Sequence, residues 1–291
     1  MTSQGSQINP QKFHKSQLKF YLILVPIALL MLLPVVYIIN HAFKPLDELF
    51  LFPPRFLVER PTLRNFQDLF RTASVTGVPM TRYLFNSIIV TVATIFATLF
   101  ITAISAYALS KKKFKQKNWL LKINETALMF VPIAVMIPRY LVIVNLGLHN
   151  NILAHIVPML AMPIGLFLVK QFIDQIPDSL IEAAKLDGAN DVKIIIKIIV
   201  PLIKPALATV ALLTFQSVWN SVESSNLFVV DETLRTFAFY MGTLTATTGD
   251  NIVAGAGMGA AAALIMFLPN LIMFIFMQSR VMNTMSHSGI K

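Results

Sequence analysis

Four polar or aromatic residues close one of the long apolar runs of this chain: Gln216, Trp219, Asn220 and Glu223. Their spacing of i, i+3, i+4 and i+7 predicts that they share one face of a helix. An indole can stack on a sugar ring, and amide and carboxylate groups can bond to its hydroxyls. An aromatic belt at a membrane surface with polar helix–helix contacts explains the same residues and is slightly favoured on these principles.

Arg139 follows Pro138 inside another apolar run. An ionisable side chain left in lipid at the centre of a bilayer costs at least about 2.5–3.5 kcal/mol, which makes it a candidate for function. Arg139 would then line a pathway and contact a hydroxyl-rich or anionic solute. Alternatively, its guanidinium extends to the lipid headgroups from about two turns inside the run. Both interpretations stay open.

Other kinds of chemistry lack the residues they need. The chain has no cysteine, which excludes disulfides, iron–sulfur clusters and thiol nucleophiles. Its five histidines are scattered, and no serine, histidine and aspartate are grouped, so we expect no metal site and no catalytic residue. No G-x-x-x-x-G-K-[ST] motif is present, so ATP and its magnesium must be bound by a separate polypeptide and this chain needs no cofactor.

The elements that hold these residues are those of a membrane protein. Of the 291 residues, 56% are hydrophobic and only 13% are charged, whereas soluble domains have about 25% charged residues. A spanning helix needs about 20 mainly apolar residues. Six stretches qualify: 20–40, 84–109, 127–146, 152–172, 198–219 and 257–277. The sequence therefore predicts an all-α membrane protein with six transmembrane helices.

The distribution of charge predicts the orientation. Most of the 24 basic residues lie between the runs in alternate segments, as in the cytoplasmic loops of membrane proteins, so we expect a multi-pass cell-membrane protein with both termini cytoplasmic. The net charge of +10 forms no basic stripe with stacking aromatics, which argues against nucleic acid as a partner. The predicted segments are a cytoplasmic N-terminus (1–19), a first helix (20–41), an external loop rich in proline and aromatics (42–82), a transmembrane core (83–278) and a cytoplasmic tail (279–291).

A segment between the fourth and fifth runs has unusually clear helix signals. Ser179 and Glu182 have the spacing of a capping box, which predicts a short helix over 180–186. Gly188 lies where a left-handed residue would end it, and Asn190 with Asp191 can cap a second short helix. Pro201 and Pro205 should then bend the chain as it enters the fifth span.

The spacing of this segment carries a family resemblance. Glu182-Ala183-Ala184, then Gly188, then Val200-Pro201 resembles the EAA loop of ABC importer permeases, with Val200 where the family usually has leucine. Further likeness to maltose-type sugar permeases lies in three stretches: Lys44-Pro45 through Pro53-Pro54, Thr62 to Phe66, and Asn86-Ser87.

The resemblance implies a transport subunit without enzymatic activity of its own. It implies that two cytoplasmic ATPase subunits dock on the EAA loop, and that a second, similar permease and an extracellular or periplasmic solute-binding protein complete the complex. The residues that it assigns to ATPase coupling are Glu182, Ala183, Ala184, Asp187, Gly188 and Pro201. The external loop over 222–256 matches in position the loop that contacts the binding protein, although a plain surface loop explains it equally.

Two other classes compete with a sugar importer. An ion-coupled secondary transporter of small solutes would need Asp or Glu relays within the spans, and these runs have almost none. A membrane-embedded enzyme would need a clustered acid, base or metal set, which the sequence does not show.

Overall fold

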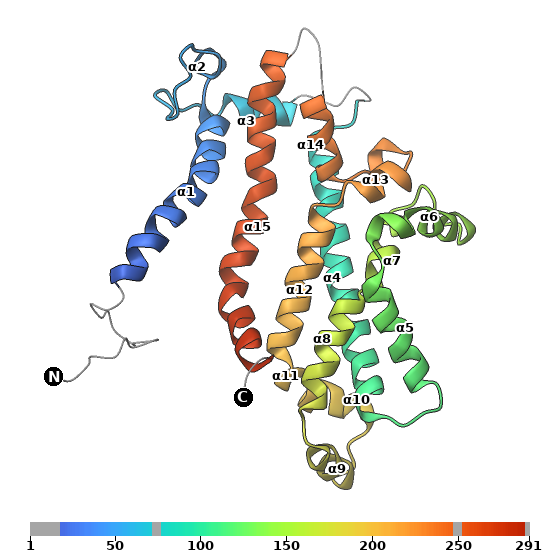
Figure 1. The fold of residues 1–291 in the computed structure, drawn as a ribbon. Helices are drawn as coiled ribbons and strands as arrows, with labels where there is room; N and C mark the ends of the chain where they lie inside the picture. The colour runs from blue at the N-terminus through green and yellow to red at the C-terminus, as the bar shows by residue number, and fades with distance from the viewer. Residues whose placement is uncertain (1–17, 72–76, 247–251, 289–291) are drawn as a thin grey trace, which may run out of the picture. The chain divides into compact units, whose positions relative to one another are not determined.

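The computed structural model describes residues 18–71, 77–246 and 252–288, without the side chains of 245–246, 252–255 and 279–288. The chain divides into two compact units, residues 1–69 with 247–264 and residues 70–246 with 265–291. Figure 1 shows the helices that make up both units. Most of the predicted cytoplasmic N-terminus (1–19) lies outside the described residues, as do residues 247–251 near the end of the predicted 222–256 loop.

The first unit begins with α1 (Leu18–Phe43), which agrees with the predicted first helix. Pro26 and Pro34 lie inside it, and the helix continues through both. None of the side chains of its most apolar stretch is buried. Such a surface suits surroundings as apolar as the helix itself.

Residues 42–71 of the predicted external loop fold back onto the end of α1. After α1 the loop contains α2 (Leu46–Leu49) and α3 (Arg64–Arg71). The buried Asn65 donates hydrogen bonds to the carbonyls of Ala42 and Lys44, at 3.0 and 2.7 Å. Glu48 is also buried and accepts bonds from the backbone N–H groups of Glu59 and Arg60 and from the Arg60 side chain. Burial by itself would raise the pKa of the Glu48 carboxyl, but these bonds outweigh burial and hold the pKa below its usual value.

The second unit is built around α4 (Met80–Lys111), which contains the predicted second span. It packs against α7 (Leu153–Leu160), α8 (Pro163–Asp174) and α12 (Lys204–Trp219). The buried face of α4 has many small side chains, which let membrane helices approach closely. These are Ser87, Thr91, Thr94, Thr98, Thr102, Ala103 and Ala106.

Three of the predicted spans are broken rather than straight. The third is α5 (Lys117–Met129) followed by η2 (Pro132–Val135) and α6 (Met136–Asn145), with a bend of 114°. The fourth bends by 45° between α7 and α8, and the fifth bends by 83° before α12. The prediction of continuous helices over 127–146 and 152–172 is therefore wrong, whereas the bend predicted from Pro201 and Pro205 at the start of the fifth span is confirmed. Proline lies at or beside each break and removes the backbone donor that a continuous helix needs: Pro132, Pro163 and Pro205.

The remaining elements are short helices and one long terminal helix. Within the described residues the chain is helical without strands, and three helices are long and apolar enough to span a membrane, or six spans exist if each bent pair counts as one. This confirms the all-α membrane class. The long helix α15 (Ile252–Ser288) contains the predicted sixth span and continues into the predicted tail. The short elements are α9 (Asp178–Leu186), α10 (Asp191–Ile194), the π-helical η3 (Ile195–Ile199), α11 (Val200–Leu202), α13 (Glu223–Leu227), η4 (Glu232–Leu234) and α14 (Phe237–Ala246).

Candidate functional site: the α9–α10 hairpin and the polar end of α12

The helix α9 begins earlier than the capping-box motif predicts. Its first residue is Asp178, and Pro177 precedes it in an extended conformation, without a capping bond from any side chain. Ser179 therefore lies inside the first turn and cannot cap the helix. The predicted capping box is wrong, because Pro177, with its fixed φ, precedes a helix that starts two residues sooner.

The end of α9 has the predicted left-handed glycine. Gly188 has φ +76°, and its N–H donates to the carbonyl of Lys185 at 3.0 Å. The N–H of Ala189 donates to the carbonyl of Ala184 at 2.9 Å. This pair of bonds is the Schellman motif, which satisfies two carbonyls at the helix end. A methyl group at Gly188 would contact no atom within 4 Å, so the requirement for glycine comes from its φ alone.

The second short helix starts at the predicted cap. The Asn190 side chain accepts a 2.9 Å bond from the N–H of Lys193, at the first turn of α10. The chain continues through η3 and α11, where Pro201 is exposed, and then turns at Ile203 into α12. We call residues 178–202 the α9–α10 hairpin.

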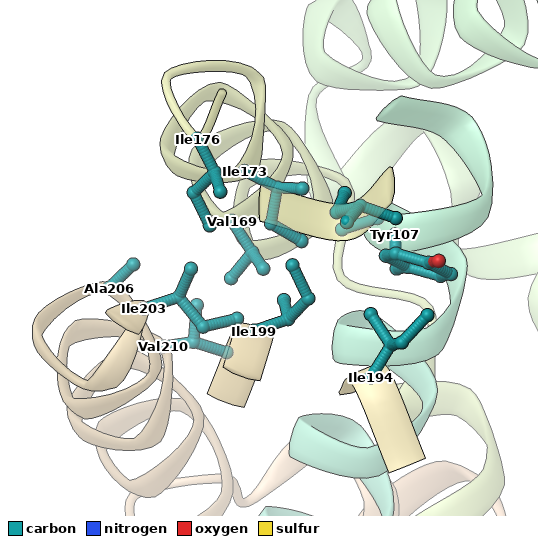
Figure 2. Close-up of a cluster of buried hydrophobic side chains, with 11 residues drawn as sticks. Tyr107, Val169, Ile173, Ile176, Ile194, Ile199, Ile203, Ala206 and Val210 are labelled. Carbon is teal, nitrogen blue, oxygen red and sulfur yellow. The ribbon is translucent and has the colours of Figure 1, made fainter. Parts of the chain in front are cut away.

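An apolar cluster anchors this hairpin to the rest of the unit. Ile181 of α9 and Ile194 of α10 are buried together with side chains of α4, α8 and α12. Figure 2 shows Val169 and Ile173 of α8 facing Ile199 and the start of α12. Burying a large aliphatic side chain contributes about 1.5–3 kcal/mol, so a cluster of this size fixes the base of the hairpin firmly.

Ion pairs add a second attachment, to the end of α4. The Lys111 ammonium lies 2.7 Å from Asp178 and donates to the carbonyl of Ile176 at 2.5 Å. The Lys112 ammonium lies 2.6 Å from Asp191, which also accepts a 3.2 Å bond from the Tyr107 hydroxyl. The hydrogen bond and charge of Lys111 lower the pKa of the Asp178 carboxyl. The hairpin is thereby held at both of its short helices.

The opposite side of α9 is free of such contacts and exposed. It presents four side chains, which we call the docking face: Glu182, Ala183, Leu186 and Asp187. Leu186 is 89% exposed and, unlike the exposed leucines of the spans, lies outside the predicted membrane-spanning runs. The sequence-based assignment missed Leu186. Leu186 could have been found because its helical position lies opposite Ile181 and Ala184, the residues that face the apolar cluster.

The four residues at the end of the fifth run that were predicted to share a helix face do not form one. The helix α12 ends at Trp219, Asn220 is its C-cap, and Glu223 begins α13, so the predicted continuous face over 216–223 is wrong. Trp219 is only 4% exposed, and its Nε1 donates to the carbonyl of Met266 at 3.1 Å. Its indole is therefore not available for stacking on a ligand. Gln216 and Asn220 are exposed.

Arg139 and Glu223, which the sequence places far apart, form an ion pair. Arg139 Nη1 lies 3.0 Å from Glu223 Oε1, and both side chains are partly buried. Arg139 lies on α6, after the 114° bend, rather than inside a straight span as predicted. A small cavity beside it is bounded by Thr214 and Ser217 of α12.

The segment from α13 to α14 is held to its neighbours by His155 and Asn86, neither of which the sequence assigned to the site. The buried His155 bonds to the Ser224 hydroxyl at 2.8 Å and to the carbonyl of Leu234 at 3.1 Å. Asn86 donates to the carbonyls of Thr233 and Arg235, at 2.8 and 2.9 Å. This part of the predicted 222–256 loop is thus a folded segment. Among the described residues no group of three metal-ligating side chains occurs.

These features define a polytopic membrane protein with a short-helix hairpin anchored at the end of a central span and exposed at its turn. Residues 98–279 match the family described as binding-protein-dependent transport system inner membrane component. The chain belongs to this family and is a permease subunit of an importer.

Named relatives and a solved structure agree with the assignment. The chain is 32% identical to LplC of Bacillus subtilis over 89% of each chain. It is 27% identical to the melibiose/raffinose/stachyose import permease MelC of Bacillus subtilis, over 79% of this chain and 81% of MelC. A crystal structure of a bacterial ABC transporter involved in alginate import matches with a TM-score of 0.80 and 22% identity, over 93% of this chain and 99% of the matched chain. That likeness supports the fold.

Proposed function

We propose that this permease subunit imports a sugar or oligosaccharide, and that its α9–α10 hairpin couples transport to a separate ATPase. The observation that carries the proposal is the two-sided character of α9. One side is fixed to the core by Ile181 and by the Lys111–Asp178 ion pair. The other side exposes Leu186 with Glu182 and Ala183.

This arrangement suits the transmission of force between two subunits. A partner that binds the docking face and moves would push on a helix whose base is attached to α4 and to α12 through the apolar cluster. Leu186 supplies apolar area for binding, Ala183 permits close approach, and the Glu182 and Asp187 carboxylates can meet basic groups. Ala184, in contrast, packs inward against the cluster and supports the hairpin.

The proposed path for solute runs past the polar end of α12. Gln216, Asn220 and the Arg139–Glu223 pair offer amide, carboxylate and guanidinium groups for a hydroxyl-rich solute. Trp219 supports this end of the helix from behind, stacked on Phe215 at 5.8 Å between ring centroids. The sugar class is supported by the named substrates of relatives such as MelC.

The rest of the complex follows from the family. We propose that a second, paralogous permease completes the path, that two ATPase subunits hold ATP and magnesium, and that a solute-binding protein delivers the substrate. Both termini and the α9–α10 hairpin would then lie on the cytoplasmic side, where the basic loops are placed by charge. Membership of an importer family favours this function over an ion-coupled transporter.

Co-purification from native membranes tests the docking face. The tagged chain is purified as wild type, as Leu186→Ser and as Leu57→Ser, which changes a leucine that is 62% exposed far along the chain from α9. An ATPase should co-purify with wild type and with Leu57→Ser, and its recovery should fall about tenfold with Leu186→Ser. This is the loss expected when about 1.4 kcal/mol of binding free energy is removed.

Uptake of labelled oligosaccharide into vesicles tests the substrate class separately. Uptake that needs ATP and the binding protein supports the importer. Uptake driven by an ion gradient with no ATPase present would contradict it. Equal ATPase recovery with all three chains would leave the importer standing and reject α9 as its coupling element.

A further inference from the structure

A cavity of 490 Å³ lies where α4 and α5 meet, outside the hairpin and the polar end of α12. Its walls are almost entirely apolar and come from α4, α5 and the start of α8, with Phe114 between the first two helices. The volume is within the range of roughly 300–1,000 Å³ found for small-molecule sites. An apolar cavity of this kind at the side of a membrane helix fits a hydrocarbon chain.

The chain between these helices is strongly basic. Lys113 and Lys115 flank Phe114, and both are exposed. Within the described residues their ammonium groups form no ion pair or hydrogen bond, whereas Lys111 and Lys112 are occupied by Asp178 and Asp191. Two positive charges are therefore available at the mouth of an apolar cavity.

An exposed tryptophan lies close to these lysines, at the start of α5. Trp119 lies in the first turns of α5, next to the cavity-lining Leu120, and is 64% exposed. Exposed tryptophan is enriched where a helix meets the headgroup region, and lysine clusters just outside a span attract anionic lipids. Lys113, Lys115 and Trp119 together have the composition of a headgroup site.

We propose that the elbow between α4 and α5, formed by residues 113–120 and the apolar cavity beside them, binds an anionic phospholipid. Lys113 and Lys115 hold the phosphate of its headgroup, and one acyl chain lies in the cavity against Phe114 and Ile123. Charge complementarity favours this occupant over a neighbouring protein helix, which would fill the apolar walls and leave both ammonium groups without a counter-charge. The site requires only that the end of α4 meets the membrane surface, and it is independent of the substrate proposed above.

Fluorescence quenching by brominated lipid tests the site. The chain has two tryptophans, so the difference in fluorescence between complexes that carry Trp219→Phe and Trp119→Phe/Trp219→Phe isolates the signal of Trp119. The complex is purified with this chain and reconstituted in phosphatidylcholine vesicles that contain an equal minority of acyl-brominated phosphatidylglycerol or acyl-brominated phosphatidylcholine. Quenching of Trp119 should be several-fold stronger with the brominated phosphatidylglycerol.

Charge variants identify the headgroup contacts. Lys113→Gln/Lys115→Gln should abolish the preference for phosphatidylglycerol. The matched variant Lys193→Gln/Lys197→Gln removes two other exposed lysines and should keep it. Equal quenching by the two lipids, or a preference that survives in Lys113→Gln/Lys115→Gln, overturns the proposal. An absence of quenching by either lipid also overturns it, because a protein then covers the elbow.

Native mass spectrometry supplies a test without the tryptophan substitution. The wild-type complex should retain phosphatidylglycerol in preference to phosphatidylcholine after detergent exchange. Ser105→Phe, which places a ring in the cavity and leaves the lysines unchanged, should reduce the retained lipid several-fold. Retention equal to wild type would reject the cavity as the place of the acyl chain.

Discussion

Gly188 determines the shape of the α9–α10 turn, because its φ of +76° is costly for residues with a side chain. We expect Gly188→Ala to destabilise the turn by about 1–2 kcal/mol, the cost of the left-handed region. Asparagine tolerates this region better, so Gly188→Asn should lose less. Recovery of the ATPase in co-purification should fall in the order wild type, Gly188→Asn, Gly188→Ala.

A glycine in a helix provides the control for this series. Gly259 lies within α15, and a methyl group there would meet no atom within 4 Å. Gly259→Ala should leave ATPase recovery unchanged. If Gly188→Ala and Gly188→Asn behave alike, the backbone conformation is not what the turn requires.

The Arg139–Glu223 ion pair connects two segments that are 84 residues apart in sequence. Both groups are partly exposed, so the interaction should contribute about 1 kcal/mol to stability. We expect Arg139→Gln and Glu223→Gln each to lower the melting temperature of the chain in detergent. The double variant should lose less than the sum of the two single losses.

Exchange of the charges separates the ion pair from other effects. Arg139→Glu/Glu223→Arg should recover part of the stability that either reversal loses alone. Strict additivity of the single and double variants would show that the two side chains act independently. Loss of uptake without loss of stability would instead point to contact with solute.

Local sequence signals predicted the residues of the α9–α10 turn, whereas the sequence did not predict the long-range ion pair of Arg139. Gly188 and Asn190 act on backbone groups within a few residues, so their spacing alone is informative. The partner of Arg139 depends on the bend between α5 and α6, which the sequence pattern did not specify. Leu186 could have been found, had apolar residues off the buried helix face been counted as candidates.

At the scale of the element, the attachment of α9 to α4 should depend on pH. The pKa of Asp178 is lower in the folded chain because of Lys111, so its ionised form favours the folded state. This stabilisation is present above the ordinary aspartate pKa of about 3.9 and is lost as pH falls through the lower folded value. Thermal melts in detergent across this acidic range should show a smaller loss for Asp178→Asn than for wild type.

Removal of the Lys111 charge tests whether the Lys111–Asp178 pair causes this pH dependence. Lys111→Met should flatten the same part of the pH profile, and the double variant with Asp178→Asn should add little. An unchanged profile in both single variants would show that other carboxylates govern the acid response.

The apolar runs predicted where the elements lie but not the breaks of the third and fourth spans, whereas Pro201 and Pro205 predicted the bend of the fifth. Hydropathy measures whether a stretch prefers lipid or water. A bent pair of helices satisfies its backbone hydrogen bonds in lipid as well as a straight helix does, so hydropathy does not distinguish the two. Prolines at 132, 163 and 205 were visible, yet Pro26 and Pro34 leave α1 unbroken, so proline alone does not decide between a kink and a break. The helices beside the fourth and fifth breaks, α7, α8 and α12, pack against α4, whereas no side chain in the most apolar stretch of α1 is buried, so tertiary packing accompanies the breaks there.

At the scale of the whole molecule, family membership makes this chain one part of a larger machine, and its own contacts suggest which pieces move together. The α9–α10 hairpin is joined to α4 by the apolar cluster and by two ion pairs. Such dense attachment favours movement of the hairpin and α4 as one rigid body when the ATPase closes, rather than a swing of the hairpin against α4.

Cross-linking distinguishes these two motions. This chain has no native cysteine, so any introduced thiols are the only ones in it, and the complex with the cysteine-free chain serves as the control for thiols of the other subunits. Lys112→Cys/Asp191→Cys replaces an ion pair between α4 and α10 with two thiols that a short bismaleimide can join. If the pieces move as one body, the cross-linked complex should keep most of its ATP-dependent uptake, compared with each single-cysteine variant treated alike. Uptake that stops on cross-linking, and returns when a cleavable linker is cut, would show that the hairpin must swing against α4. The Lys111–Asp178 and Lys112–Asp191 ion pairs would then open in each transport cycle.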